Sequence, residues 1–275
     1  MPRETIRLAL AQLAWCDGER DQCVQQIEAI ICAQGARHDL IVFPETCTTG
    51  FSSRDILERD AQPIDGPIVA RIHALARKLD VAVVLGLAER AAERLFNAAV
   101  GIGPDGVFLH YRKTHLWVQE RDLFDAGNRL TVRDWKGLRL GLLICFDLEF
   151  PEPARVLAGL GAQLIVVPNG NMTPYGDLQL RAAAARAQEN QLFVAIANRT
   201  GVQGNTQFSG RSAVINPFGE IIRSAGSDEP EVLSVSLDLS ELQQSRSMYD
   251  YLNCRRIGIA PTAARAALKD DEYII

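Results

Sequence analysis

The stretch GLLICFDLEFPE, residues 141–152, decides how this chain is organised. An apolar run ends abruptly at Cys145, acidic residues follow it, and Pro151 begins a predicted helix. A buried strand that ends in a cysteine places a thiol at the carboxyl end of the strand, where open α/β sheets bind their ligands. An isolated cysteine in such a run is more often a small core residue, because free cysteine is among the most buried residue types. The role of Cys145 therefore depends on its partners elsewhere in the chain.

Composition excludes several classes of protein. The 275 residues are 47% hydrophobic and 23% charged, which is typical of a globular protein with a buried core. The formal net charge of −5 gives no electrostatic signature for nucleic acid or an anionic membrane. No apolar run approaches the roughly 18 residues that a membrane-spanning helix needs. We therefore expect neither nucleic acid nor a membrane among the partners.

The use of cysteine indicates the compartment. The six cysteines are scattered without a C-x-x-C pair, which favours a reducing cytoplasm over a disulfide framework. Their spacing does not match a zinc site, and the amino terminus has no signal-peptide cleavage pattern. We predict a cytoplasmic protein.

Buried strands alternate with helices along the chain. Strands are predicted at residues 6–13, 39–43, 81–87, 138–146, 162–167, 193–197 and 232–237. Helices are predicted at residues 21–35, 67–79, 151–159, 177–190 and from 238 onwards, and hairpins at 97–111 and 210–224. Residues 112–135 are predicted to be a functional loop region, and residues 247–275 a polar tail. Because strand–helix–strand followed by a hairpin occurs twice, we expect two similar halves whose sheets pack face to face, helices outside, in a single domain over residues 1–275.

Further predicted strand ends carry polar groups that a core does not need. Glu45 directly follows one strand, and Lys113 lies in YRKTHL, residues 111–116, after the first hairpin. Glu120 comes next, with Phe124 and Gly127 at fixed distances. Each of these residues alone is typical of a helix cap, a turn or a solvated face. With the cysteine they make one thiol, two carboxylates and one lysine.

Such a set can carry out acyl transfer. A cysteine needs a base to become a thiolate, and a carboxylate can serve if burial raises its pKa. A nearby ammonium can stabilise negative charge that develops on an acyl oxygen. Histidine is the usual alternative base, and spacing alone does not choose between Glu45 and His115.

In these motifs the chain resembles the nitrilase superfamily of carbon–nitrogen hydrolases. Residues 43–45 (FPE), 111–116, 120–127 and 141–152 occur in the family's order, and the resemblance covers essentially the whole chain. One such motif is weak, whereas four in order are specific. The resemblance implies a four-layer αββα sandwich that assembles as a homodimer or a higher even-numbered homo-oligomer, with the tail of about residues 247–275 in the dimer contact.

The resemblance also implies a mechanism. Cys145 would be the nucleophile, Glu45 the general base and Lys113 the stabiliser of the tetrahedral intermediate. Glu120 would orient substrate and lysine, and the backbone N–H of Phe146 would be the second oxyanion donor. Attack on a small-molecule amide would release ammonia and leave a thioester that water hydrolyses. This chemistry needs no metal and no organic cofactor, and we interpret His110 and His115 as structural.

Membership of the superfamily does not fix the substrate. Branches that take carboxylate-bearing substrates resemble one another in having arginine at or near position 149, where this chain has Glu149. A carboxylate disfavours an anionic substrate and suits a neutral or cationic one. The pattern DLEFPE, residues 147–152, resembles that of the aliphatic amidase and aminoamide amidase branch. Alternatively, Glu149 binds Arg155, Lys113 or a backbone amide.

The strand after Cys145 ends at Asn169, Gly170 and Asn171, whose amides are predicted substrate contacts. Trp117, Tyr175 and Phe208 are predicted pocket walls. Three functions follow: an amidase for a small neutral or cationic aliphatic amide, an N-carbamoyl-amine hydrolase of the same fold, or a non-catalytic scaffold. The filled active-site positions argue against the scaffold.

Overall fold

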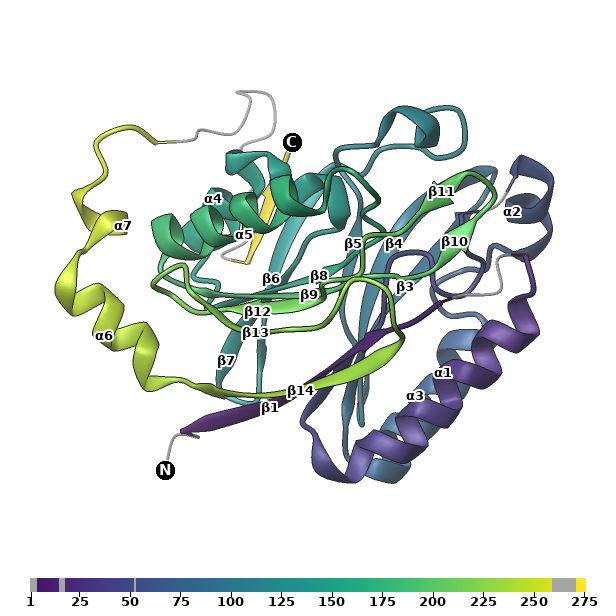
Figure 1. The fold of residues 1–275 in the computed structure, drawn as a ribbon, viewed down its shortest axis with the longest axis horizontal. Coiled ribbons are helices and arrows are strands. Elements are labelled where there is room, and N and C mark those ends of the chain that lie inside the picture. Colours follow the sequence, from purple (N-terminus) through teal and green to yellow (C-terminus); the bar gives the residue numbers. More distant parts are fainter. Residues whose placement is uncertain (1–3, 15–17, 52, 259–270) are drawn as a thin grey trace.

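The apolar runs of the first half, together with one strand from the second half, assemble into a six-stranded sheet (Figure 1). The computed structural model describes residues 4–14, 18–51, 53–258 and 271–275. In spatial order the strands are β14 (Glu231–Asp238), β1 (Thr5–Gln12), β2 (Leu40–Val42), β3 (Ala82–Ala91), β4 (Arg94–Gly103) and β5 (Gly106–Arg112). The pairs β1–β2 and β2–β3 are parallel, and the other neighbours are antiparallel.

The second half repeats this arrangement in a seven-stranded sheet. Its order is β13 (Ile221–Ser224), β12 (Ala213–Ile215), β9 (Phe193–Ala197), β8 (Leu164–Pro168), β7 (Leu138–Leu142), β6 (Arg129–Trp135) and β15 (Glu272–Ile274). Again three parallel strands, β7, β8 and β9, continue into antiparallel neighbours. The prediction of two similar halves is confirmed.

Helices cover the outer face of each sheet. Figure 1 shows α1 (Arg20–Gln34) and α3 (Pro67–Leu79) beside the first sheet, and α4 (Pro151–Gly159) and α5 (Gly176–Asn190) beside the second. These four helices lie within one residue of their predicted bounds. The predicted four-layer αββα sandwich is therefore confirmed. Shorter elements are η1 (Gly35–Arg37), α2 (Arg54–Asp60), η2 (Val118–Glu120), η3 (Cys145–Glu149), β10 (Val202–Gln203), β11 (Thr206–Gln207), α6 (Ser240–Met248) and α7 (Tyr251–Cys254).

Alternation along the strands builds two cores. In β1, Leu8 and Leu10 face the other sheet, and Ala9 and Ala11 face the helices α1 and α3. Strands buried on both faces read as continuous apolar runs, which is why these strands were predictable from sequence. No helix in the described part of the chain is long and apolar enough to cross a membrane.

Three elements differ from their predictions. Strand β7 ends at Leu142 rather than at residue 146, and the predicted loop region of residues 112–135 ends in the strand β6. The predicted polar tail contains α7 and β15, and β15 pairs with β6 because Glu272 binds Arg129 and Arg133 and Tyr273 packs on the core. The part of the tail at residues 259–270 lies outside the described residues.

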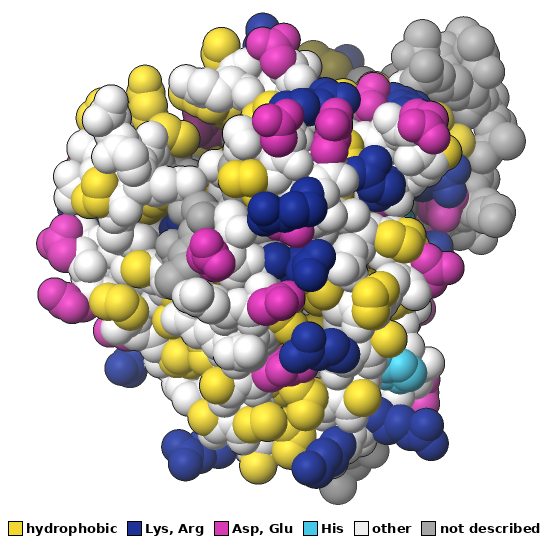
Figure 2. Space-filling model, turned by 90° about the vertical axis from the view of Figure 1, so that its right-hand side faces the viewer, with side chains coloured by type: hydrophobic (Ala, Val, Ile, Leu, Met, Phe, Trp, Pro, Cys, Tyr) yellow, Lys and Arg dark blue, Asp and Glu magenta, His cyan; other side chains and the backbone are white. Residues whose placement is uncertain are grey.

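The surface mixes charges of both signs. Figure 2 shows basic and acidic side chains interspersed on one face of the molecule, without a broad area of a single sign. Exposed ion pairs such as Arg54–Glu58, Arg71–Glu28 and Arg94–Asp125 contribute to this mixture. The distribution agrees with the small net charge of −5.

Candidate active site

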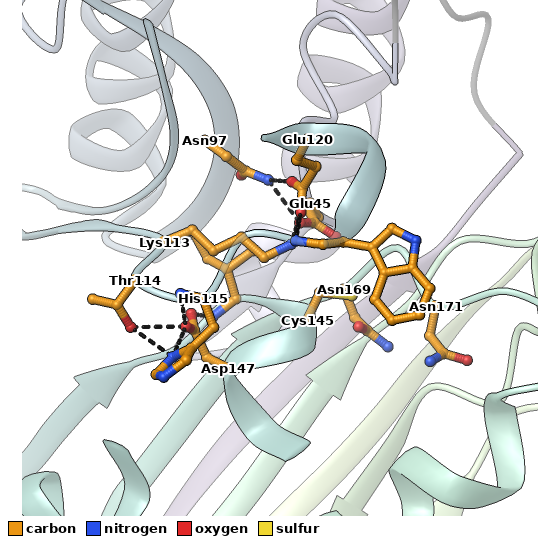
Figure 3. A network of polar contacts seen from close by, with 12 residues as sticks. Glu45, Asn97, Lys113, Thr114, His115, Glu120, Cys145, Asp147, Asn169 and Asn171 are labelled. Atoms are coloured by element: carbon orange, nitrogen blue, oxygen red, sulfur yellow. Dashed lines mark hydrogen bonds and ion pairs between the residues drawn. The ribbon is translucent and has the colours of Figure 1, made fainter. Parts of the chain in front are cut away.

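Four predicted side chains from separate parts of the chain line one cavity of about 400 Å³. Glu45 follows β2, Lys113 follows β5, Glu120 ends η2 and Cys145 begins η3. All four are at most 9% exposed. Figure 3 shows them converging from both sheets. Glu45 and Lys113 thus come from the first sheet and Cys145 from the second.

Lys113 holds the two carboxylates together. Its Nζ lies 2.6 Å from Oε1 of Glu45 and 2.6 Å from Oε2 of Glu120. The amide of Asn97 donates to both carboxylates, at 2.7 Å to Glu45 and 2.5 Å to Glu120. Oε2 of Glu45 has no hydrogen-bond partner among the described residues. One oxygen of Glu45 is therefore fixed, and the other is available to accept a proton.

Burial and charge set the protonation of the site. Burial raises the pKa of Glu45 above its usual value, although the Lys113 ammonium opposes the shift. Burial also raises the pKa of the Cys145 thiol well above its usual value, and the Glu45 carboxylate adds to this effect. Burial lowers the pKa of Lys113, but the two carboxylates outweigh it and raise that pKa well above normal. The site thus combines a neutral thiol, a strengthened carboxylate base and a cation.

Cys145 occupies a tight turn rather than the end of the strand. Its φ of 44° lies in the left-handed region, which a residue other than glycine adopts only where the surroundings hold it. Two residues of extended chain separate β7 from this turn, and the N–H of Leu143 still bonds to Val166. The backbone N–H of Gly170 donates a hydrogen bond that lowers the thiol pKa.

Asp147, which is fully buried, ties the cysteine turn to the lysine loop. Its Oδ2 accepts from the N–H of Ile144 at 3.0 Å and from the hydroxyl of Tyr111 at 2.8 Å. Its Oδ1 accepts from Thr114 Oγ1 at 2.9 Å and from the N–H of His115 at 2.8 Å (Figure 3). The motif at residues 111–116 and the motif at residues 141–152 therefore meet through one carboxylate.

The residues that follow Glu120 support Lys113. Phe124 is buried in a small apolar cluster, and its N–H bonds to the carbonyl of Glu120. The N–H of Gly127 donates to the carbonyl of Lys113 at 2.8 Å. A Cβ on Gly127 would lie 2.1 Å from the carbonyl oxygen of Arg112, so only glycine permits this approach. The spacing of Glu120, Phe124 and Gly127 therefore helps to fix the position of Lys113.

The histidines lie outside the cavity. His115 contacts Asp147 and stacks on Phe150, and His110 Nε2 lies 2.8 Å from Glu89, which also binds Arg112. Of the two candidate bases that spacing left open, Glu45 lines the cavity and His115 does not. Among the described residues, no group of three or more His, Cys, Asp or Glu side chains could hold a metal ion.

Aromatic side chains form the walls. Trp117 packs edge-on against Phe146 and Tyr175, with ring centroids 4.9 and 5.4 Å apart. Phe208, which stacks on Phe51, also lines the cavity, and the β10–β11 hairpin contributes Gln203, Gly204 and Thr206. The three predicted walls therefore border the cavity.

Glu149 lines the same cavity and is half-buried. Its carboxylate forms no hydrogen bond or ion pair with another described residue, and Arg155 pairs instead with Glu189. Burial raises the pKa of Glu149, and the positive charge of Lys113 opposes this shift from a distance, without a hydrogen bond. The alternative in which Glu149 is occupied by Arg155 or Lys113 is therefore absent from the structure.

The segment after β8 behaves differently from its prediction. Gly170 and Asn171 line the cavity, but Asn169 does not. The side chain of Asn169 is instead paired with Gln179, at 2.6 and 3.0 Å, so its amide has no access to a substrate. A Cβ on Gly170 would lie 2.5 Å from the Phe51 ring and 2.8 Å from Oε2 of Glu45.

Sequence reasoning missed Asn97, Gln179 and the organising role of Asp147. Asn97 is the one polar side chain within the run LFNAAVGIG of β4, and this interruption could have revealed it. Asp147 stands two residues after the cysteine, but its partners other than Ile144 are distant in sequence. Gln179 is one of many polar residues in α5, and nothing in its helix distinguishes it.

The fold and the site define a hydrolase that works through a cysteine nucleophile in an αββα sandwich. The chain belongs to the carbon-nitrogen hydrolase family, whose model matches residues 7–247, and it acts on amide C–N bonds. It is 44% identical to an (R)-stereoselective amidase from Pseudomonas sp., over 92% of each chain.

Solved structures agree with this assignment. An amidase from Nesterenkonia sp. superposes with a TM-score of 0.82 at 28% identity, over 92% of this chain and 95% of that one. A mutant of the amidase from Nesterenkonia sp. AN1 carries the acetamide moiety of fluoroacetamide covalently on its active-site cysteine. That mutant superposes with a TM-score of 0.79 at 27% identity, over 93% of this chain and 95% of the other.

Proposed function

We propose that residues 1–275 act as one domain that hydrolyses a small neutral or cationic aliphatic amide to a carboxylate and ammonia through a thioester on Cys145. The convergence of Cys145, Glu45, Lys113 and Glu120 in one buried cavity is the observation that carries this proposal. The cavity volume of about 400 Å³ suits a small substrate rather than a polypeptide.

The first step forms the acyl-enzyme. Oε2 of Glu45 takes the thiol proton as Sγ of Cys145 attacks the amide carbon, and the carbonyl electrons move to the oxygen. Lys113 and the N–H of Phe146 stabilise this oxyanion. Glu45 then gives the proton to the departing nitrogen, ammonia leaves and the C–N bond is replaced by a thioester.

The second step releases the acid. Glu45 takes a proton from water, whose oxygen attacks the thioester, and the oxyanion forms again in the same place. When it collapses, the C–S bond breaks, Glu45 returns the proton to the thiolate, and the carboxylic acid leaves and loses its proton to solvent as the carboxylate. Glu120 takes part in no proton transfer in this scheme, and it fixes Lys113 by the 2.6 Å ion pair.

Glu149 supports a preference for a cationic substrate. Its carboxylate lies in the cavity with the nucleophile and has no cationic side chain paired with it in the described chain. The aromatic rings of Trp117, Phe146 and Tyr175 also line the cavity, and aromatic rings attract an ammonium group. An aminoamide thus supplies a cationic partner to a half-buried carboxylate that has none among the described residues.

Two variants test the proposal. Cys145→Ala is expected to abolish ammonia release and to keep the fold, and turnover in that variant would refute the nucleophile. Glu149→Gln is expected to lower kcat/KM roughly tenfold for an aminoamide such as 5-aminopentanamide and to change pentanamide hydrolysis less than about threefold. Glu152→Gln, an exposed neighbour, is the matched control. An equal loss for both amides would refute cation recognition.

A substrate panel separates the remaining alternatives. Amides, N-carbamoyl amines and nitriles are compared for ammonia release, and carbon dioxide released together with ammonia would identify an N-carbamoyl-amine hydrolase instead. Because the Pseudomonas relative is an (R)-stereoselective amidase, chiral amides are tested as separate enantiomers.

We also propose a cytoplasmic homodimer whose contact includes the tail. Cys32, Cys47, Cys145 and Cys254 are free thiols, which suits a reducing compartment. Met248, Tyr249, Tyr251 and Ile257 are exposed, although they are apolar, and a groove beside α4 and α5 lies next to them. Ile257→Asp is expected to shift the sedimentation coefficient from dimer to monomer, and an unchanged value would exclude this contact.

A further inference from the structure

Gln179, which does not line the cavity, binds the backbone carbonyl of Cys145. Its Nε2 donates to the carbonyl of Cys145 at 3.2 Å and to Oδ1 of Asn169 at 3.0 Å, and its Oε1 accepts from Asn169 at 2.6 Å. The same Nε2 lies 4.0 Å from the Cys145 sulfur. A carbonyl only accepts, so Gln179 must direct its NH₂ group to Cys145, which fixes the orientation of both amides. Asn169 and Gln179 are both at most 3% exposed.

Asn169 connects this amide pair to the general base. Its carbonyl accepts from the N–H of Glu45 at 3.3 Å, and its own N–H donates to Ala197 at 2.9 Å. The next residue, Gly170, donates to the Cys145 sulfur. One residue of the second sheet therefore contacts, directly or through Gln179, both the base segment and the nucleophile turn.

The direction of the Cys145 carbonyl determines the direction of the Phe146 N–H. In a trans peptide the C=O and the next N–H point in opposite directions within one rigid plane. Because Gln179, which does not line the cavity, binds the Cys145 carbonyl, the Phe146 N–H points away from Gln179, and Phe146 itself lines the cavity. This orientation is held before substrate arrives, as an oxyanion donor requires.

We infer that Gln179, braced by Asn169, is a positioning residue that sets the oxyanion donor of this enzyme. The inference rests on the proposed function, in which Cys145 is the nucleophile and the Phe146 N–H binds the oxyanion. It also gives a role to the buried amide of Asn169, which does not line the cavity and so cannot contact a substrate directly.

Gln179→Met is the primary test, because methionine has a similar length and no hydrogen-bonding amide. We expect kcat to fall roughly 10- to 100-fold with KM changed less than about threefold, since the donor is displaced rather than deleted. Gln12→Met is the matched control. Gln12 is equally buried and makes three hydrogen bonds to backbone groups of Ser212, Gly226 and Glu229, and it does not line the cavity. The control should lose stability without this loss of kcat.

Two probes of the cysteine separate positioning of the donor from general damage. Butanal adds to the Cys145 thiol as a thiohemiacetal whose oxygen occupies the oxyanion position, so its inhibition constant should rise by the same factor as kcat falls. Iodoacetamide alkylates the same sulfur by displacing iodide and forms no oxyanion. Its rate should stay within about threefold of the wild type.

Gln179→Glu provides a second readout if the methionine variant does not fold. The carboxylate that this substitution introduces cannot donate to the Cys145 carbonyl when it is ionised, whereas the protonated carboxyl group can. The activity of this variant relative to wild type should therefore rise as pH falls from about 8 to about 5.

Two results would overturn the inference. The first is a Gln179→Met enzyme with kcat and butanal inhibition within about twofold of wild type. The second is a loss of alkylation rate that equals the loss of kcat, because the residue would then act on the thiol itself. Activity that persists in Cys145→Ala would instead refute the proposed function, so the two failures are distinguishable.

Discussion

Replacing Asp147 by asparagine tests whether one buried carboxylate holds the lysine loop against the cysteine turn. Asp147 accepts hydrogen bonds from two backbone N–H groups and two hydroxyls, at 2.8 to 3.0 Å. Asparagine keeps one oxygen but places an NH₂ group where the other oxygen met the N–H of Ile144. The variant thus loses a charge-assisted bond, worth about 1.5 to 3 kcal/mol, and buries an unpaired N–H. We expect a loss of about 3 kcal/mol of unfolding free energy, out of a total of about 5 to 15.

The measurement is urea unfolding followed by circular dichroism, together with kcat for ammonia release. We expect kcat to fall at least roughly tenfold even where the variant is fully folded, because Lys113 and Cys145 lose their shared anchor. Asp134→Asn, at an exposed position of β6, is the control and should change stability by less than about 0.5 kcal/mol. A stability loss of Asp147→Asn below about 1 kcal/mol with normal kcat would refute the reasoning.

The ion pairs of Glu89 and the close packing of Gly170 lead to two further predictions. The histidine and arginine partners of Glu89 lower its pKa to about 2 despite burial, so its ion pairs stabilise the fold above about pH 4.5 and this contribution is lost as pH falls toward 2. In urea titrations Glu89→Gln should therefore be about 3 kcal/mol less stable than wild type at neutral pH and nearly equal to it near pH 2, and a pH-independent difference would contradict the assignment. Gly170→Ala should lower kcat more than tenfold, because its Cβ would meet the Phe51 ring at 2.5 Å and Glu45 at 2.8 Å. Gly159→Ala is the control, because a Cβ at this position of α4 meets nothing within 4 Å, and it should keep full activity. Equal activity in both variants would show that the segment around Gly170 shifts to accommodate the added methyl group, which contradicts the prediction.

Sequence was most informative where one local pattern decides the structure. The parallel strands are apolar on both faces and the helices start and end at clear residues, as α3 does at Pro67 and Leu79. The four polar side chains were predictable because each follows such a strand or its hairpin, and because the motifs match the family. Their convergence in one cavity depends on how the two sheets pack. The family resemblance implied this packing, but no local sequence pattern contains it.

The remaining features depend on contacts between distant residues. Strand β15 exists because β6 offers an edge and Glu272 finds Arg129 and Arg133, which no pattern in the tail encodes. Strand β7 stops early because Asp147 captures the N–H of Ile144 for the turn. Asn169 looked like a substrate contact because it ends a strand beside the site, but a partner in α5 occupies its amide.

The division of the site between two sheets has a consequence for biosynthesis. Glu45 and Lys113 leave the ribosome with strands β1 to β5, before the strand β7 that precedes the thiol and the helix α5 that carries Gln179 are complete. Until the second sheet docks, Cys145 has neither its base nor the N–H of Gly170. The nascent chain therefore holds an ordinary, weakly acidic cysteine, and reactivity toward amides arises only when the last of the sandwich layers closes.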